Sequence, residues 1–196
     1  AFHQPSLVFS ALSTLSTLPA AERRSGLGEA VKHGVLGDEA LLSFIEDNAD
    51  AVRMGEPAAL ARLVEDSVRI KAEVVSQDER ESGLRVVLNL GHSVGHALES
   101  AIGHGVLRHG ECVALGLVAE ARWAEAGHGG MVGLGDRLER LFSRIGMPVS
   151  VPPLRLAIAV DAARVDKKLA HGTLRIGIPV QPGVAVPATV PAGELS

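Results

Sequence analysis

The stretch from Arg85 to Gly116 constrains the fold of this chain more than any other. Half of the eight histidines lie in an 18-residue part of it, at His92, His96, His104 and His109. If the segment is helical, the spacing of His92 and His96 places both imidazoles on one face. Such a pair often holds a divalent metal, but it is also common as an ordinary hydrogen-bonded or surface pair. Spacing alone therefore leaves a metal site open.

Hydrophobic periodicity predicts helices along most of the chain. Apolar residues recur at helical spacing in six segments, 20–36, 58–77, 87–102, 109–126, 130–145 and 154–169. Asp38 is suited to cap a further helix that ends near residue 48. A turn is expected at 103–105, where glycine recurs between the two histidine-bearing segments.

Two segments show the pattern of strands instead. Residues 173–180 alternate and, with the residues after Pro182-Gly183, predict a hairpin, while Leu7 to Ser10 predict a short strand without an evident neighbour. The Pro/Ala/Gly-rich residues 187–196 are expected to form a flexible tail. We therefore expect a mainly α fold, a helical bundle over residues 1–186 with a short N-terminal strand and a small C-terminal β-hairpin.

Composition excludes several classes of protein. A chain of 196 residues with 46% hydrophobic and 21% charged residues is typical of one globular domain. A net charge of −4 without a concentrated basic face argues against a nucleic-acid partner. No apolar run is long enough to span a membrane. The single Cys112 cannot form an internal disulfide, so a cytoplasmic setting is expected.

Lysine is rare in this chain although arginine is not. There are 15 arginines and four lysines, at Lys32, Lys71, Lys167 and Lys168. An ammonium and a guanidinium are not interchangeable where an anion is bound at close range, although biased composition explains the count equally well. Glu29 stands three residues before Lys32 and, in isolation, predicts an ordinary surface ion pair. Four other histidines are interpreted as surface or loop residues, namely His33, His104, His128 and His171.

Several motifs in order resemble one family. The stretch R-V-V-L-N-L-G-H-S-V-G-H-A-L-E, followed by L-R-H-G-E-C-V-A-L-G, closely resembles the C-terminal domain of 3-dehydroquinate synthase, a sugar-phosphate cyclase. G-L-G-E-A-V-K-H-G is similar to the first metal-ligand helix of that family, and K-A-E-V-V-S-Q-D-E-R-E-S-G-L-R and V-D-K-K follow in the expected order. The resemblance covers about residues 1–180.

The resemblance implies roles for particular side chains. Glu29, His92 and His109 match metal ligands, usually of zinc and alternatively of cobalt. Spacing alone would favour His92 with His96 as the ligand pair, whereas the resemblance gives His96 and Glu81 proton-transfer roles. The residues that match the substrate pocket are Lys32, Lys71, Arg85, Asn89 and one of Lys167 and Lys168. All four lysines therefore match positions tied to an anionic substrate.

The family's reaction belongs to the shikimate pathway of aromatic amino acid biosynthesis. It converts 3-deoxy-D-arabino-heptulosonate 7-phosphate to 3-dehydroquinate and phosphate, with transient oxidation of one alcohol by NAD. The metal lowers the barrier to oxidation at the substrate hydroxyls. A histidine such as His96, with an ordinary pKa of about 6.5, can transfer protons near neutrality.

The sequence departs from the family pattern in one respect. The family has an N-terminal NAD-binding domain, whereas no G-x-G-x-x-G loop follows a strand in this chain, so we expect that domain to be absent. The chain would then be an excised domain or part of a longer protein, inactive alone, and by resemblance a homodimer. The alternatives are another sugar-phosphate cyclase, a metal-dependent enzyme of the glycerol dehydrogenase type, and a non-catalytic helical module.

Overall fold

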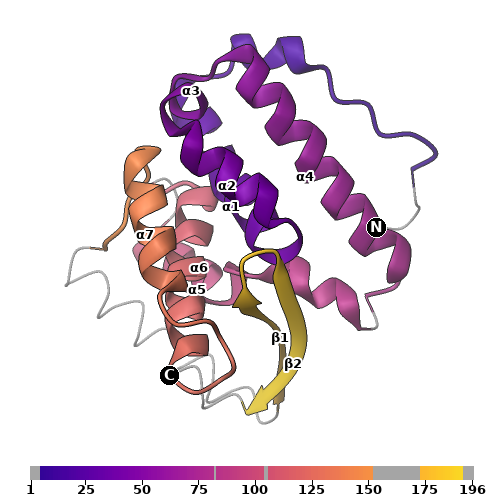
Figure 1. Cartoon of the computed structure of the whole chain (residues 1–196), viewed down its shortest axis with the longest axis vertical. Coiled ribbons are helices and arrows are strands. Elements are labelled where there is room, and N and C mark those ends of the chain that lie inside the picture. The colour runs from indigo at the N-terminus through magenta and orange to yellow at the C-terminus, as the bar shows by residue number, and fades with distance from the viewer. Residues whose placement is uncertain (1–4, 82, 104–105, 152–172, 192–196) are drawn as a thin grey trace.

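The computed structural model describes residues 5–81, 83–103, 106–151 and 173–191 and shows a mainly helical domain with a C-terminal hairpin (Figure 1). The α-helices are α1 (Ala20–Gly37), α2 (Glu39–Asp47), α3 (Ala49–Met54), α4 (Pro57–Gln77), α5 (His92–Ile102), α6 (His109–Glu125) and α7 (Leu134–Arg144). Two 3₁₀ helices, η1 (Leu12–Ser16) and η2 (Leu84–Asn89), precede α1 and α5. No described helix is both long and apolar enough to cross a bilayer.

Local signals in the sequence explain where the helices begin. Asp38 caps α2 as predicted, because its carboxylate accepts a hydrogen bond from the N–H of Ala40 at 2.9 Å. Pro57 is the first residue of α4, where its missing N–H has no intrahelical partner to lose. The apolar stripe of α4 then buries Leu60, Leu63 and Ile70 in the core.

Helix α6 is the centre of the domain, since most of its side chains are buried and α1, α5 and α7 all pack on it. Glycines let two of these helices approach its backbone closely. An added Cβ on Gly28 of α1 would overlap the carbonyl of Gly110, and one on Gly116 of α6 would overlap the carbonyl oxygen of Gly91. Helices α1 and α5, which carry most of the candidate metal ligands, are therefore held in direct backbone contact with α6.

The C-terminal hairpin pairs β1 (Thr173–Gln181) with β2 (Val184–Pro191) in antiparallel register, with Ile178 opposite Val186. It packs on η2 and α6, and Gly177 lies against the backbone of Val87. Figure 1 shows the hairpin below α1. The hairpin and α4 therefore both pack against η2.

Three predictions of local structure are wrong within the described residues. Residues 7–10 form no strand, and Leu7 and Phe9 are more than four-fifths exposed, because no described strand pairs with them (Figure 1). The helix expected over 87–102 begins only at His92, after η2 and a left-handed Gly91 with φ 77°. The tail does not fray from Pro187, because β2 continues to Pro191 and Val190 is buried.

The remaining predictions agree with the structure or lie outside it, except that the helix predicted over 130–145 begins only at Leu134, after a left-handed Gly133 with φ 90°. The helical bundle and the hairpin are confirmed, as are the helices predicted over 20–36, 58–77 and 109–126 to within about one residue. The helix predicted over 154–169 lies outside the described residues, as do residues 192–196 of the expected tail.

Candidate metal centre

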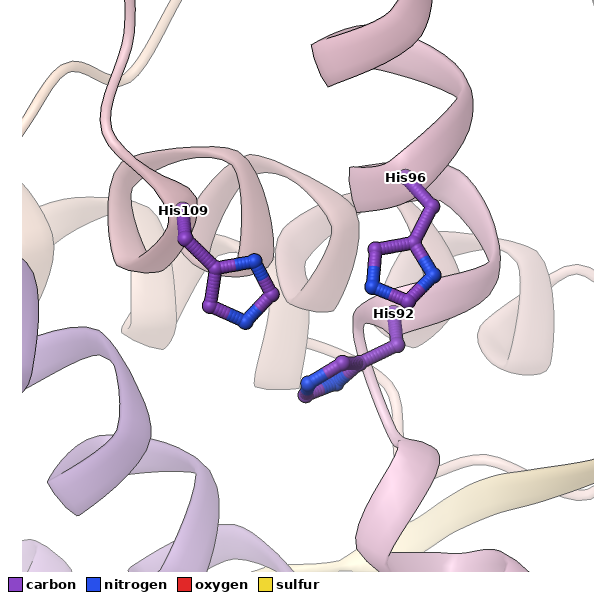
Figure 2. Close-up of side chains that lie close together, drawn as sticks. All are labelled: His92, His96 and His109. Carbon is purple, nitrogen blue, oxygen red and sulfur yellow. The ribbon is translucent and has the colours of Figure 1, made fainter.

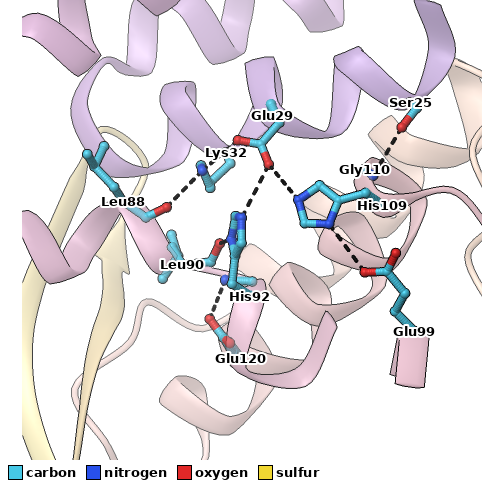
Figure 3. Close-up of polar contacts among 11 residues, drawn as sticks. Ser25, Glu29, Lys32, Leu88, Leu90, His92, Glu99, His109, Gly110 and Glu120 are labelled. Carbon is cyan, nitrogen blue, oxygen red and sulfur yellow. Dashed lines mark hydrogen bonds and ion pairs between the residues drawn. The ribbon is translucent and has the colours of Figure 1, made fainter. Parts of the chain in front are cut away.

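The site begins with two histidines that occupy the first positions of two helices. His92 starts α5 and His109 starts α6, and Glu29 reaches them from the middle of α1. Figure 3 shows the Glu29 carboxylate lying between the two imidazole rings. Glu29 Oε1 is 3.4 Å from His92 Nε2 and 3.6 Å from His109 Nε2. Three side chains from distant parts of the sequence thus meet at one point.

His96 joins this group from the next turn of α5. Its ring centroid lies 5.2 Å from that of His92 and 5.7 Å from that of His109 (Figure 2). One nitrogen from each of the three rings lies within 4.8 Å of the others, a spacing that could hold a metal ion. Geometry therefore offers two overlapping sets of donors, the three histidines, or Glu29 with His92 and His109.

Hydrogen bonds distinguish the three rings. His92 Nδ1 lies 3.1 Å from the carbonyl oxygen of Leu90, and His109 Nδ1 lies 3.4 Å from Glu99 Oε2. Carbonyl and carboxylate oxygens only accept, so each contact places a proton on Nδ1 and leaves the Nε2 lone pair for another partner. Among the described residues, no hydrogen bond orients the ring of His96 in this way.

The Nε2 lone pairs of His92 and His109 both face Glu29 Oε1, which is itself an acceptor. Three acceptor atoms that converge in this way form a set that a cation stabilises. Nitrogen and carboxylate oxygen donors suit zinc, and a second nitrogen bonded to a carbonyl or carboxylate is the usual support of a metal-binding histidine. The donor set that the residues present therefore fits a divalent metal.

The charges around the site favour these protonation states. Burial acts to raise the pKa of Glu29, but the charge and hydrogen bond of Lys32, aided by His92, hold it below its ordinary value. Burial lowers the pKa of His92, although the hydrogen bond to Leu90 acts to raise it. The lowered pKa favours the neutral ring. A neutral imidazole and an ionised carboxylate are the forms that bind a metal.

Lys32 is buried, and its ammonium bridges α1 and η2. Its Nζ donates to Glu29 Oε2 at 2.6 Å and to the carbonyl oxygen of Leu88 at 2.8 Å (Figure 3). The side chain is only 4% exposed, so the surface ion pair predicted from spacing is wrong. Burial, together with the nearby charge of Lys71, lowers the pKa of Lys32, while Glu29 opposes this. Two ammonium groups that repel each other favour an anion between them.

A cavity of about 550 Å³ opens beside these side chains. Its lining includes most of the residues that the sequence predicted for the site, namely Glu29, Lys32, Lys71, Glu81, Arg85, Asn89, His92 and His109. Arg85 donates to the carbonyl oxygen of Glu79 at 2.8 Å, and Asn89 donates to Glu81 Oε1 at 3.3 Å. His96 stands next to His92 but does not line the cavity, and Lys167 and Lys168 lie outside the described residues.

Sequence reasoning missed two residues of this cavity, Leu88 and His33, and misplaced the second. His33 was interpreted as a surface or loop histidine, yet it is 8% exposed and lines the cavity behind Lys32. Burial, with the charge of Lys32, lowers its pKa to about 4. No pattern in the sequence marks it, because its position next to Lys32 does not show which face of α1 is covered.

Glu120 is a second buried acid near the site. Burial raises its pKa to about 7, although the N–H groups of Gly91, Val94 and Ser93 and the charge of Lys32 act in the opposite direction. Its Oε2 accepts a hydrogen bond from the N–H of Gly91 at 2.6 Å (Figure 3). Sequence reasoning gave Glu120 no role.

Residues 26–169 match the family model described as 3-dehydroquinate synthase C-terminal, which is more than half of the chain. The chain belongs to the 3-dehydroquinate synthase family. The 3-dehydroquinate synthase of Symbiobacterium thermophilum is 48% identical over 190 residues, which cover 95% of this chain and 52% of the relative. That of a Synechococcus strain is 41% identical, and the match covers 100% of this chain and 54% of the relative. The chain thus spans about half the length of the curated relatives it matches.

Solved structures of sugar-phosphate cyclases share the fold. A 2-epi-5-epi-valiolone synthase from Streptomyces hygroscopicus subsp. jinggangensis, with NAD⁺ and Zn²⁺ bound, superposes with a TM-score of 0.78 at 24% identity and covers 100% of this chain and 55% of that one. A 2-deoxy-scyllo-inosose synthase complexed with carbaglucose-6-phosphate, NAD⁺ and Co²⁺ superposes with a TM-score of 0.72 at 22% identity. That match covers 94% of this chain and 53% of the other. The helical domain described above is therefore the C-terminal fold of the 3-dehydroquinate synthase family.

Proposed function

We propose that this chain is the metal- and substrate-binding part of a 3-dehydroquinate synthase. The overall reaction would convert 3-deoxy-D-arabino-heptulosonate 7-phosphate to 3-dehydroquinate and phosphate in the shikimate pathway. The observation that carries the proposal is the convergence of Glu29, His92 and His109 beside a cavity lined by Lys32 and Lys71. Family membership supports the same assignment. NAD would be bound by a further domain, and the assembly would be a homodimer.

Glu29, His92 and His109 would hold zinc or cobalt. The hydrogen bonds of the two Nδ1 atoms support this set over the three histidines, because they leave both Nε2 atoms aimed at Glu29 Oε1. Three protein ligands leave positions free for substrate, as a catalytic site requires. When bound, the metal would act as a Lewis acid on substrate hydroxyls.

The basic side chains of the cavity would bind the two anionic groups of the substrate, its carboxylate and its phosphate. Lys32 is fixed by two hydrogen bonds, whereas Lys71 is exposed and has no such anchor in the described part of the chain. Arg85 brings a planar guanidinium suited to paired oxygens. One of Lys167 and Lys168 would add a further contact.

His96 and Glu81 would transfer protons. His96 is exposed and stands beside His92, so it can exchange protons with water. Glu81 lines the cavity and takes a left-handed backbone conformation with φ 58°, which is uncommon outside glycine and often found at functional positions. Its contact with Asn89 turns the carboxylate towards the cavity.

Metal stoichiometry tests the ligand assignment directly. We expect one zinc or cobalt ion per chain by equilibrium dialysis and elemental analysis, lost in Glu29→Ala, His92→Ala and His109→Ala and retained in His96→Ala. Metal loss in His96→Ala with retention in Glu29→Ala would assign the site to the three histidines instead. Absence of metal binding by the unsubstituted chain would favour a non-catalytic helical module.

Turnover tests the reaction. We expect these 196 residues alone, supplied with NAD, metal and the heptulosonate phosphate, to release no phosphate, because they span about half the length of the relatives and NAD would be bound elsewhere. Phosphate release with formation of 3-dehydroquinate by the protein that includes that domain would confirm the activity. A different cyclic product would place it with another sugar-phosphate cyclase, and a simple ketone would indicate an enzyme of the glycerol dehydrogenase type.

A further inference from the structure

The two candidate imidazole ligands depend on where their helices begin. His92 and His109 are the first residues of α5 and α6, so a small movement of either helix start moves a ligand. The start of α6 is bound locally, because Glu111 of its own first turn accepts from the N–H of Arg108 at 2.9 Å. The start of α5 has no such local cap, since its N-cap is Gly91.

A side chain from another helix takes the place of that cap. Glu120 lies near the end of α6, is only 4% exposed, and accepts a hydrogen bond from the N–H of Gly91 at 2.6 Å. Its second oxygen has no hydrogen-bond partner within the described residues. A buried carboxylate at a helix start is favourable, because the first N–H groups lack intrahelical acceptors and carry a partial positive charge.

The contacts lead directly from Glu120 to the candidate ligand. Gly91 adjoins Leu90, whose carbonyl oxygen accepts from His92 Nδ1 at 3.1 Å, and His92 Nε2 then faces Glu29. Gly91 is also pressed against α6, where an added Cβ would lie 2.7 Å from the carbonyl oxygen of Val113. Glu120 thus holds the turn at Leu90 and Gly91, which sets the position and the orientation of the His92 ring.

We propose that Glu120 is a positioning residue for His92. It touches neither the metal nor the substrate, and it acts by fixing the start of α5 so that His92 Nε2 meets Glu29 and His109. The inference rests on the metal site proposed above. A residue that supports a ligand in this way typically changes metal affinity by about 10- to 100-fold when it is replaced.

The chain contains a matched control. Glu125, five residues further along α6, accepts from the N–H of Gly135 at 2.6 Å and so binds the start of α7 as Glu120 binds the start of α5. Helix α7 carries none of the candidate site residues. Replacing Glu125 therefore removes the same kind of bond from the same helix without moving a ligand.

The experiment compares Glu120→Met, Glu120→Gln and Glu125→Met by cobalt titration, cobalt absorption spectrum and thermal unfolding. We expect both methionine variants to lose thermal stability, but only Glu120→Met to bind cobalt at least tenfold more weakly and with an altered spectrum. Glu120→Gln, which keeps an acceptor oxygen, should recover most of the affinity. Should Glu120→Met fail to fold, Glu120→Asp, which withdraws the carboxylate by one methylene, takes its place with the same expectation.

Two results separate the inference from the proposal on which it rests. Cobalt binding by the unsubstituted chain, with Glu120→Met or its substitute equal to Glu125→Met in affinity and spectrum, would overturn the positioning role alone. Failure of the unsubstituted chain to bind cobalt would overturn the metal site, and with it the role of Glu120.

Discussion

Gly116 marks the closest approach of α6 to the start of α5, and its replacement by alanine should affect both stability and metal binding. The added Cβ would lie 2.8 Å from the N of Gly95 and closer still to the carbonyl oxygen of Gly91. Ordinary contact begins near 3.4 Å, so α5 must move away by at least 0.6 Å for the Gly95 contact alone, and further for Gly91.

The free energy follows from two opposing effects. Overpacking of this kind costs about 1–3 kcal/mol, and the upper end applies because both opposing atoms belong to the backbone and cannot rotate away. Alanine in a helix is favoured over glycine by about 1 kcal/mol. The net loss for Gly116→Ala is therefore about 2 kcal/mol, or a fall in Tm of about 4–8 °C for a chain of this size. The same movement shifts His92, so cobalt affinity should fall about tenfold or more.

Gly26→Ala is the control, because Gly26 lies in α1 and an added Cβ there meets nothing within 4 Å. It should gain about 0.5–1 kcal/mol from helix propensity alone and keep its affinity for cobalt. Calorimetry and cobalt titration of both variants measure the difference. If Gly116→Ala were as stable as Gly26→Ala and bound cobalt equally well, the close packing of α5 on α6 could not be what fixes the site.

Three further predictions concern charged groups. The pKa of His33 is about 4 in the folded chain against an ordinary 6.5, so the unfolded chain takes up a proton on this side chain at a higher pH than the folded chain does. The stability that neutral His33 contributes is therefore complete above pH 6.5 and is lost as the pH falls towards 4. In urea unfolding, the change in stability from pH 7 to pH 5 should be less favourable in the unsubstituted chain than in His33→Gln by on the order of 1–2 kcal/mol, because the opposite effect of the raised pKa of Glu120 is common to both. An identical pH dependence in the two proteins would contradict this. Lys32→Met should lower stability by about 1–3 kcal/mol in urea, because partly buried oxygens of Glu29 and Leu88 lose their donor. A more stable variant would refute that account. Arg137→Met should cost about 1 kcal/mol, because both guanidinium bonds to Glu46, at 2.8 Å, join α7 to α2 in a partly exposed setting, and an unchanged Tm would show that this pair contributes nothing.

Periodicity and capping predicted the helices well where each helix is set by its own residues. Asp38 caps a helix where expected, and Pro57 begins α4 within one residue of the predicted start, because both starts depend only on neighbouring residues. The helix predicted from Val87 failed because its apolar pattern continues through Gly91 without interruption. Only the contact of Gly91 with α6, a helix that begins 18 residues later, shows that the backbone turns there.

The candidate site was predicted from family motifs and could not have been assembled from spacing. Local spacing favoured His92 with His96 and gave Glu29 and Lys32 an exposed ion pair. The structure instead joins Glu29 to two helix starts, and it buries Lys32 against the carbonyl of Leu88, which is 56 residues away in the sequence. Burial at this distance is a tertiary property, so the depressed pKa of His33 was equally beyond the reach of a local pattern.

The hairpin makes the cavity depend on a segment that is synthesised after all of the described helices. Gly177 of β1 rests on the backbone of Val87, within the η2 segment that supplies Arg85, Leu88 and Asn89 to the cavity wall. Helices α1, α5 and α6 can meet as soon as residue 125 has left the ribosome. The η2 wall, in contrast, gains the support of the hairpin only after β2 is complete. During translation, the helices that carry the candidate metal ligands can therefore come together before the wall of the cavity is complete.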